Sequence, residues 1–82
     1  MDIVVHAKGS GKLVRVVDRI AGKEVLNDFL APEEQRPVSV ASNDGQSGDI
    51  DVYKRMTAQN PEYIDREDYH VALNEIVDVT DA

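Results

Sequence analysis

The stretch K-G-S-G-K-L at residues 8–13 is the strongest candidate for chemistry, because glycines and a lysine follow an apolar run. A phosphate-binding loop has the pattern Gly-x-x-x-x-Gly-Lys-Ser/Thr, in which backbone amides hold the phosphates and the hydroxyl holds magnesium. Counted from Lys12, the first glycine position is occupied by His6 and the hydroxyl position by Leu13. Such a loop must also open a helix, whereas the residues that follow are strand-forming. The stretch therefore predicts a turn without a bound nucleotide.

The acidic stretch S-N-D-G-Q-S-G-D-I-D at residues 42–51 has the composition of a calcium-binding loop. With Gly45 at the sharp turn of an EF-hand loop, Asp44 and Asp51 fall at ligand positions. The leading ligand position would then be Val40, whose side chain has no oxygen, and no helical pattern precedes the loop. We therefore predict a connection whose acids face water, and we expect no metal or other cofactor.

The chain has two histidines, His6 and His70, near opposite ends of the sequence, and no cysteine. Two isolated histidines are weak evidence for a metal site. A catalytic histidine needs a nucleophile and an orienting carboxylate beside it. None of these serines lies in a recognisable nucleophile motif: Ser10, Ser39, Ser42 and Ser47. The sequence therefore predicts that the protein is not an enzyme.

The formal net charge is −7 at pH 7, and residues 60–82 hold most of the excess, with seven acids against Arg66 alone. Acidic surfaces repel nucleic acid and attract basic proteins. We therefore expect a protein partner with a basic surface and no direct contact with nucleic acid. The predicted partner-binding residues are six of these acids: Glu62, Asp65, Glu67, Asp68, Glu75 and Asp78. The alternative is that the acids only keep the protein soluble.

Five short segments have the composition or the alternation of β-strands: residues 2–7, 12–18, 24–30, 37–41 and 49–54. The first two are β-branched runs on either side of K-G-S-G, which predicts a hairpin. The third also fits one face of a helix, and we favour the strand because a glycine turn precedes it and Pro32 ends it. In the fifth, Ile50 and Val52 alternate with acids, which predicts that both point inward.

The apolar period changes beyond residue 56, where an amphipathic helix is predicted. Its apolar stripe, at i, i+3, i+4 and i+7, consists of Tyr69, Ala72, Leu73 and Ile76. Asp65 is placed as the N-cap, and the acids that follow it put negative charge in the first turn. We expect Leu73 and Ile76 to anchor this helix in the core.

Together these elements predict an α+β fold, in which four to five short antiparallel strands form a meander or a sandwich-like sheet with one C-terminal helix. A length of 82 residues indicates a single domain, residues 1–82, with a β-rich part at 1–55 and an acidic helical part at 60–82. A helix that left the sheet would pack on a second copy, so a homodimer is an alternative. Without a signal-peptide pattern or a membrane-spanning apolar run, we expect a soluble, cytoplasmic protein that makes no membrane contact.

A small, acidic, cysteine-free chain with valine-rich strands is similar to accessory proteins encoded by phages and mobile elements, although no diagnostic motif carries the resemblance. The leading hypothesis is a non-catalytic protein-binding module that acts as an inhibitor or an assembly component. The alternative is a nucleic-acid mimic of the anti-restriction or anti-CRISPR type, whose carboxylates imitate phosphates and block a basic nucleic-acid-binding protein. Exposed carboxylates in rows would indicate the mimic, whereas an apolar patch with a polar rim would indicate the general binder.

Overall fold

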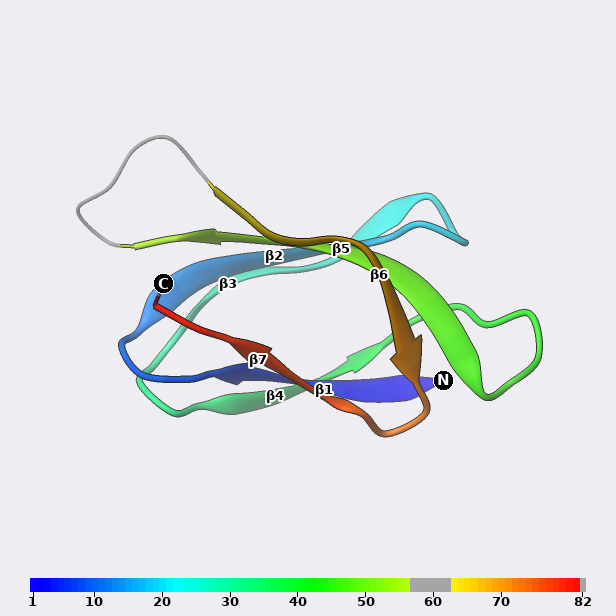
Figure 1. Cartoon of the computed structure of the whole chain (residues 1–82), viewed down its shortest axis with the longest axis horizontal. Helices are drawn as coiled ribbons and strands as arrows, with labels where there is room; N and C mark the ends of the chain where they lie inside the picture. Colours follow the sequence, from blue (N-terminus) through cyan, green and yellow to red (C-terminus); the bar gives the residue numbers. More distant parts are fainter. Residues whose placement is uncertain (57–62, 82) are drawn as a thin grey trace.

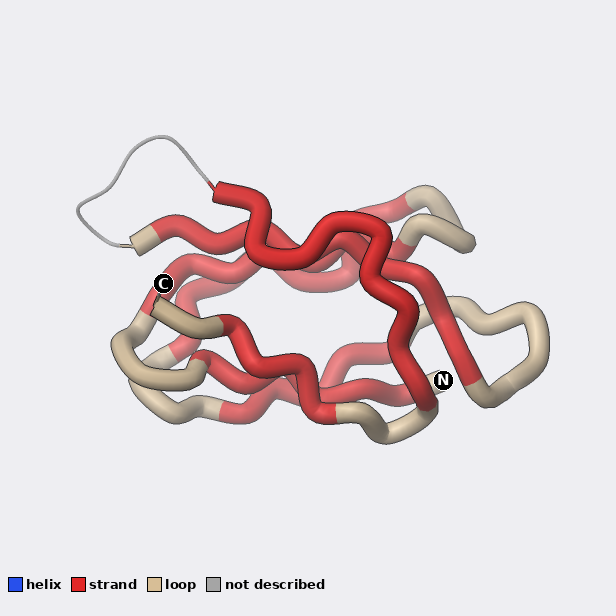
Figure 2. The backbone as a smooth tube through the Cα atoms, viewed as in Figure 1, coloured by secondary structure: helices blue, strands red, loops and turns tan. Residues whose placement is uncertain are grey.

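The computed structural model describes residues 1–56 and 63–81, and of residues 63–65 it describes the backbone alone. The regular structure of these residues consists of β-strands (Figure 2). No helix long and apolar enough to cross a membrane occurs in this part of the chain. The strands are β1 (Asp2–Ala7), β2 (Lys12–Asp18), β3 (Lys23–Leu30), β4 (Gln35–Ser39), β5 (Ser47–Arg55), β6 (Tyr63–Ala72) and β7 (Ile76–Val79).

The strands form two sheets that lie face to face as a β-sandwich (Figure 1). One sheet has the order β4-β1-β7, and the other has the order β3-β2-β5-β6. β1 is antiparallel to β4 and parallel to β7. The strand pairs of the four-stranded sheet are antiparallel, with irregular register in β2–β3 and β5–β6. The chain therefore passes from one layer to the other after β1, β3, β4 and β6.

The core between the sheets is aliphatic and consists mainly of β-branched side chains. These have restricted rotamers and pack well on a pleated surface, so they favour strands. In β2 and β5 every second side chain is buried, and the predicted inward position of Ile50 and Val52 is confirmed. The buried residues are Ile3, Val5, Ala7, Val14, Val16, Leu30, Val38, Val40, Ile50, Val52, Val71, Val77 and Val79.

Three charged side chains are buried with this core: Lys12, Asp18 and Lys54. Lys12 and Lys54 lie at one end of the β2–β5 pair, and Asp18 lies at the other. The Asp18 carboxylate accepts hydrogen bonds from the amides of Ala21 (3.1 Å) and Ala41 (2.6 Å), so it joins the β2–β3 turn to the segment after β4. Lys12 donates to the carbonyls of Lys8 and Val79, and Lys54 donates to the carbonyl of Thr80. Each buried charge therefore has backbone partners, which offset part of its desolvation.

The predicted strands over residues 2–7 and 12–18 are present, but the predicted hairpin between them is wrong. β1 and β2 lie in different sheets, so residues 8–11 connect the two layers (Figure 1). The local pattern of two apolar runs and a glycine turn fits both arrangements, and only the remaining strands decide between them. The segment at 24–30 is confirmed as a strand: β3 pairs with β2 in an antiparallel hairpin.

The predicted α+β class and C-terminal helix are also wrong, because the region forms β6 and β7. Leu73 and Ile76, the expected anchors of the helix, are 46% and 53% exposed. The buried side chains follow a period of two instead, since Val77 and Val79 are fully buried on either side of Asp78. The run I-V-D-V therefore carried a strand signal that competed with the helical stripe, and burial against the sandwich decided the outcome.

Candidate binding surface

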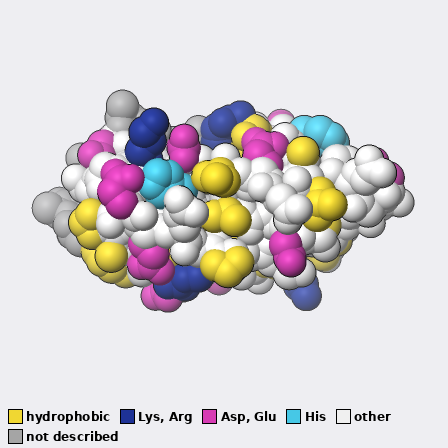
Figure 3. Space-filling view, turned by 90° about the horizontal axis from the view of Figure 1, so that it is seen from below, with side chains coloured by type: hydrophobic (Ala, Val, Ile, Leu, Met, Phe, Trp, Pro, Cys, Tyr) yellow, Lys and Arg dark blue, Asp and Glu magenta, His cyan; other side chains and the backbone are white. Residues whose placement is uncertain are grey.

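Three apolar side chains form a row across the outer face of the three-stranded sheet. In the strand register, Val4 of β1 lies between Pro37 of β4 and Ile76 of β7. Its neighbours along the strand, Ile3 and Val5, are fully buried, so the row faces away from the core. Ile76 is 53% exposed, Pro37 is exposed and Val4 is half-buried. Figure 3 shows hydrophobic side chains gathered across the middle of this face, which we call the β4-β1-β7 face.

A histidine lies in the next row of the same face, held between two carboxylates. The His6 Nδ1 atom lies 2.8 Å from the Asp78 Oδ1 atom, and its Nε2 atom lies 2.8 Å from the Glu33 Oε1 atom. The His6 side chain is only 15% exposed. Figure 3 shows a histidine surrounded by charged side chains beside the apolar group. β1, β7 and the β3–β4 connection therefore meet at this ring.

This geometry favours the protonated form of the histidine. A neutral imidazole has one N–H donor, whereas an imidazolium ring has two. Both nitrogens of His6 face carboxylate oxygens, so the arrangement requires the imidazolium form. The hydrogen bond with Asp78, followed by that with Glu33, raises the pKa of His6 above its usual value. Lys8 adds a second cation at the border, with its Nζ atom 4.0 Å from Asp78.

Glu33 is held in an uncommon backbone conformation at this site, with φ at +63°. A non-glycine residue rarely occupies this left-handed region without compensating contacts. Its Oε2 atom accepts a hydrogen bond from the Gly9 amide at 2.6 Å. That bond and the one with His6 lower the pKa of the Glu33 carboxyl. The side chain thus joins the glycine-rich connection to the histidine.

The glycine-rich connection does hold anions, and they are carboxylates of the protein itself. Besides the Gly9–Glu33 bond, the Ser10 amide donates to Asp81 Oδ1 at 3.0 Å, and the Lys12 ammonium lies 2.9 Å from the same atom. Gly9 adopts a φ of +89°, and a Cβ atom there would come within 2.6 Å of the Asp81 carboxylate. The sequence showed these donors, but their internal partners lie more than 20 residues away.

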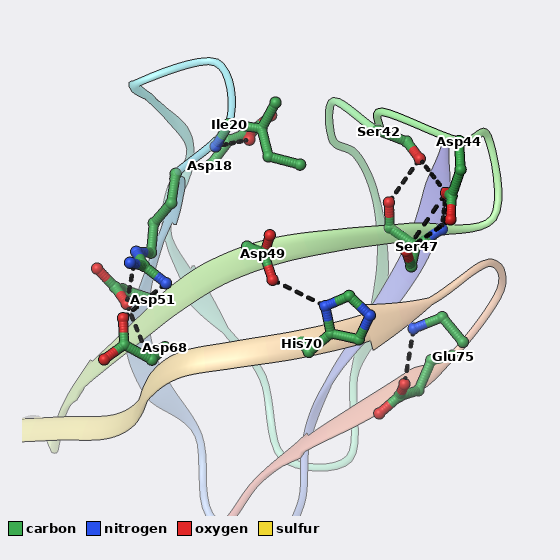
Figure 4. A network of polar contacts seen from close by, with 12 residues as sticks. Asp18, Ile20, Ser42, Asp44, Ser47, Asp49, Asp51, Asp68, His70 and Glu75 are labelled. Carbon is green, nitrogen blue, oxygen red and sulfur yellow. Dashed lines mark hydrogen bonds and ion pairs between the residues drawn. The ribbon is translucent and has the colours of Figure 1, made fainter.

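Of the acids predicted to bind a partner, Glu62 lies outside the described residues, and of Asp65 only the backbone is described, on β6. Glu67 and Asp68 are exposed on β6. Asp68 forms an ion pair with Arg19 at 2.6 Å (Figure 4), so its charge is partly neutralised within the chain.

The remaining two predicted acids lie near the three-stranded sheet. Glu75, in the β6–β7 turn, accepts hydrogen bonds from the Tyr69 hydroxyl and from the Ala72 amide. Asp78 lies on β7 beside His6. The predicted acids with described side chains therefore do not form one row, and Asp78 lies two residues from Ile76 on the same side of β7.

The other predicted candidates have structural partners. The Asp44 carboxylate accepts hydrogen bonds from the amides of Gln46 and Ser47, which lowers its pKa to about 2. Figure 4 shows Asp44 beside Ser47. His70 lies 2.8 Å from Asp49 on the neighbouring strand, and its side chain is 65% exposed. Among the described residues, no group of three or more histidine and acidic side chains is arranged to bind a metal.

The outer face of the four-stranded sheet has a different chemistry. Leu13 and Phe29 are cross-strand neighbours, and Phe29 is 42% exposed. The Arg15 guanidinium lies 4.1 Å from the centre of the Tyr53 ring, so a cation covers this half-buried ring. This second face provides a matched surface against which the first can be tested.

Comparison with known proteins assigns no family to the chain. No protein-family model matches it, and neither a curated protein nor a solved structure was found to match. The function is therefore inferred from the arrangement of these side chains alone.

Proposed function

We propose that the protein is a non-catalytic protein-binding module that meets a basic protein partner through the β4-β1-β7 face. In this role it acts as an inhibitor or as a component of an assembly, in the cytoplasm. The observation that carries the proposal is the apolar row of Pro37, Val4 and Ile76, exposed at the surface and bordered by charge. An apolar centre with a polar rim is typical of protein–protein interfaces.

The size of the face sets what the partner must touch. A standard interface buries roughly 800 Å² on each partner, which is about a sixth of the 4548 Å² surface of this chain. The three side chains of the apolar row cover less area than such an interface. The contact therefore includes the acidic side chains on the border of the row, among them Asp2, Glu33 and Asp78. The net charge of the whole chain, −7 at pH 7, favours a basic partner and accelerates the encounter.

The alternative of a nucleic-acid mimic has less support. A mimic needs carboxylates that are free to meet the lysines and arginines of its target. Many described carboxylates are instead paired with cations of the same chain. Such pairs are His6–Glu33, His6–Asp78, Lys12–Asp81, Arg19–Asp68, Arg36–Asp28 and Arg36–Glu34.

Two matched substitutions test the proposal. Ile76→Asp places a charge in the apolar row, and Phe29→Asp places the same charge on the outer face of the other sheet. Both side chains are exposed, so both variants should keep the thermal midpoint of the wild type. The three immobilised proteins are used to capture partners from a lysate of the source cell, and a photoreactive group at residue 76 maps the contact.

We expect a protein that is retained by the wild type and by Phe29→Asp, is lost from Ile76→Asp, and cross-links to residue 76. Equal retention by all three proteins would contradict the assignment of this face. A partner lost only from Phe29→Asp would move the binding site to the four-stranded sheet.

A further inference from the structure

The charge of the β4-β1-β7 face depends on a single proton at its border. With His6 as the imidazolium, the two cations His6 and Lys8 balance the carboxylates of Glu33 and Asp78. Both carboxylates then accept hydrogen bonds from within the chain. When the ring loses a proton, the group acquires one negative charge, and one nitrogen faces a carboxylate oxygen without a hydrogen between them. One carboxylate is thereby released from its internal donor.

Resting on the proposed function, we propose that His6 makes the β4-β1-β7 face a proton-linked binding surface. In the protonated state the face pairs its own carboxylates, and in the neutral state it offers a carboxylate to the basic partner. His6 is two residues from Val4 on the same side of β1, and Asp78 is two residues from Ile76 on the same side of β7. The switch therefore lies directly beside the apolar row.

The groups that face the ring come from every element around it. β7 contributes Asp78, and the β3–β4 connection contributes Glu33. The β1–β2 connection contributes Lys8, which lies near Asp78. The cross-strand neighbour on β4 is Gln35, which carries no charge. The two carboxylates favour the imidazolium and burial of the ring opposes it. The carboxylates prevail because Asp78 and then Glu33 are hydrogen-bonded to the ring, which raises the pKa of His6.

Linkage gives this arrangement a measurable consequence. If the neutral form binds a basic partner more tightly by some factor, the partner must lower the proton affinity of His6 by the same factor. We expect the affinity for the partner to be about fivefold or more higher above the titration of His6 than below it. A factor of about five is the low end of typical coupling between sites. Binding above that titration therefore needs no proton release, whereas binding below it releases a proton.

The switch is first tested on the protein alone by NMR. The imidazole signals of His6 should titrate above those of an unperturbed histidine, and both Glu33→Gln and Asp78→Asn should lower the His6 value. A cationic nitroxide serves as the probe of local charge, with a neutral nitroxide as reference. The relaxation of the Val4 and Ile76 methyl signals by the cationic nitroxide should increase as the pH rises through the His6 titration, because the face then becomes more negative. His6→Gln should remove this pH dependence, and the matched control His70→Gln should keep it.

The second test uses the partner that depends on Ile76. Its affinity should rise with pH for the wild type and for His70→Gln, and should be constant for His6→Gln. A partner whose affinity is the same on both sides of the His6 titration would overturn the regulation and leave the proposed function standing. Capture of no partner that depends on the face would overturn the proposed function and this use of His6 with it. A His6 signal that titrates at the ordinary value of a histidine side chain, with no change in nitroxide relaxation, would overturn the switch itself.

Discussion

Two clusters of charge hold the end of the three-stranded sheet against the glycine-rich connection, and they differ in how their cation meets water. In one, Lys12 is fully buried and lies 2.9 Å from Asp81. In the other, His6 lies at the surface border between Glu33 and Asp78. Each cluster also includes a backbone amide of the connection. The two clusters thus both join the sheet to the connection, but only Lys12 is fully withdrawn from solvent, whereas 15% of the His6 side chain stays exposed.

This difference assigns the clusters to different tasks. When a buried ammonium loses its partners, no water replaces them. The contacts of a buried ammonium are therefore important for stability. Ion pairs at the surface contribute little to stability because water and salt screen them. Histidine, however, changes its charge near neutral pH, whereas lysine does not. We conclude that the buried cluster stabilises the fold, whereas the surface cluster sets the charge of the β4-β1-β7 face.

Of the substitutions in the two clusters, Lys12→Ala is expected to lower the free energy of unfolding the most. The substitution removes a fully buried side chain whose ammonium donates to the carbonyls of Lys8 and Val79, both at 2.8 Å. We expect a loss of about 3–5 kcal/mol in the free energy of unfolding, measured by urea denaturation. Lys12→Met keeps most of the stem and should lose less. Equal losses in both variants would mean that packing by the stem is unimportant.

A smaller effect is expected from Asp81→Asn, because the Asp81 side chain is 47% exposed and water can replace part of its contact. The Lys12 hydrogen bond, followed by the Ser10 amide, lowers the pKa of the Asp81 carboxyl. Its contribution to stability is therefore complete above the pKa of an unfolded aspartate and disappears as the pH falls through the lower folded value. The difference in unfolding free energy between wild type and variant should shrink to zero on acidification. A constant difference would contradict this assignment.

His6→Gln should have a smaller effect still, and one with the opposite pH dependence. Because the pKa of His6 is raised in the folded protein, its contribution is complete below the pKa of an unfolded histidine. That contribution is lost as the pH rises through the folded value. Thermal unfolding of wild type and variant should therefore differ most at mildly acidic pH and converge on the alkaline side. Convergence on the acid side would place the stabilising form of His6 in the neutral state.

The smallest effect is expected from His70→Gln. This histidine has one carboxylate neighbour, Asp49, and its side chain is 65% exposed. An exposed pair of this kind changes stability within experimental error in most proteins. Equal thermal midpoints across the pH range would sharpen the contrast with His6, and a midpoint change as large as that of His6→Gln would remove it.

The sequence supported the positions of the first five strands because their signals are local: β-branched runs, flanking turn residues or short alternation of apolar and polar side chains. Ile50 and Val52, for example, are separated by one acid and both point inward. It did not support the pairing of β1, whose neighbours β4 and β7 begin far along the chain. In the last segment, a helical stripe and a strand alternation overlapped, and only burial of Val77 and Val79 against the sandwich distinguished them.

The site was predictable only in part, for the same reason. The sequence singled out His6 as one of two isolated histidines, and the structure places it on the outer face of β1. Its partners Glu33 and Asp78 are 27 and 72 residues away, so neither could be connected with it before the fold was known. Asp78 was chosen for its charge, whereas Val4 and Pro37 had no local signal, because a row across a sheet takes one residue from each strand.

The parallel pairing of β1 with β7 has a consequence for how the protein forms. Val4 and Ile76 are neighbours in the sheet, yet 71 residues lie between them in the sequence. During synthesis β1, the central strand of this sheet, is made before β7. The two strands can pair only after all of the residues between them have been made. Pairings of such separation slow folding, because the chain loses entropy before the contact forms. Until β7 arrives, one edge of β1 is open to other chains, so nascent-chain aggregation is the main hazard that this topology creates.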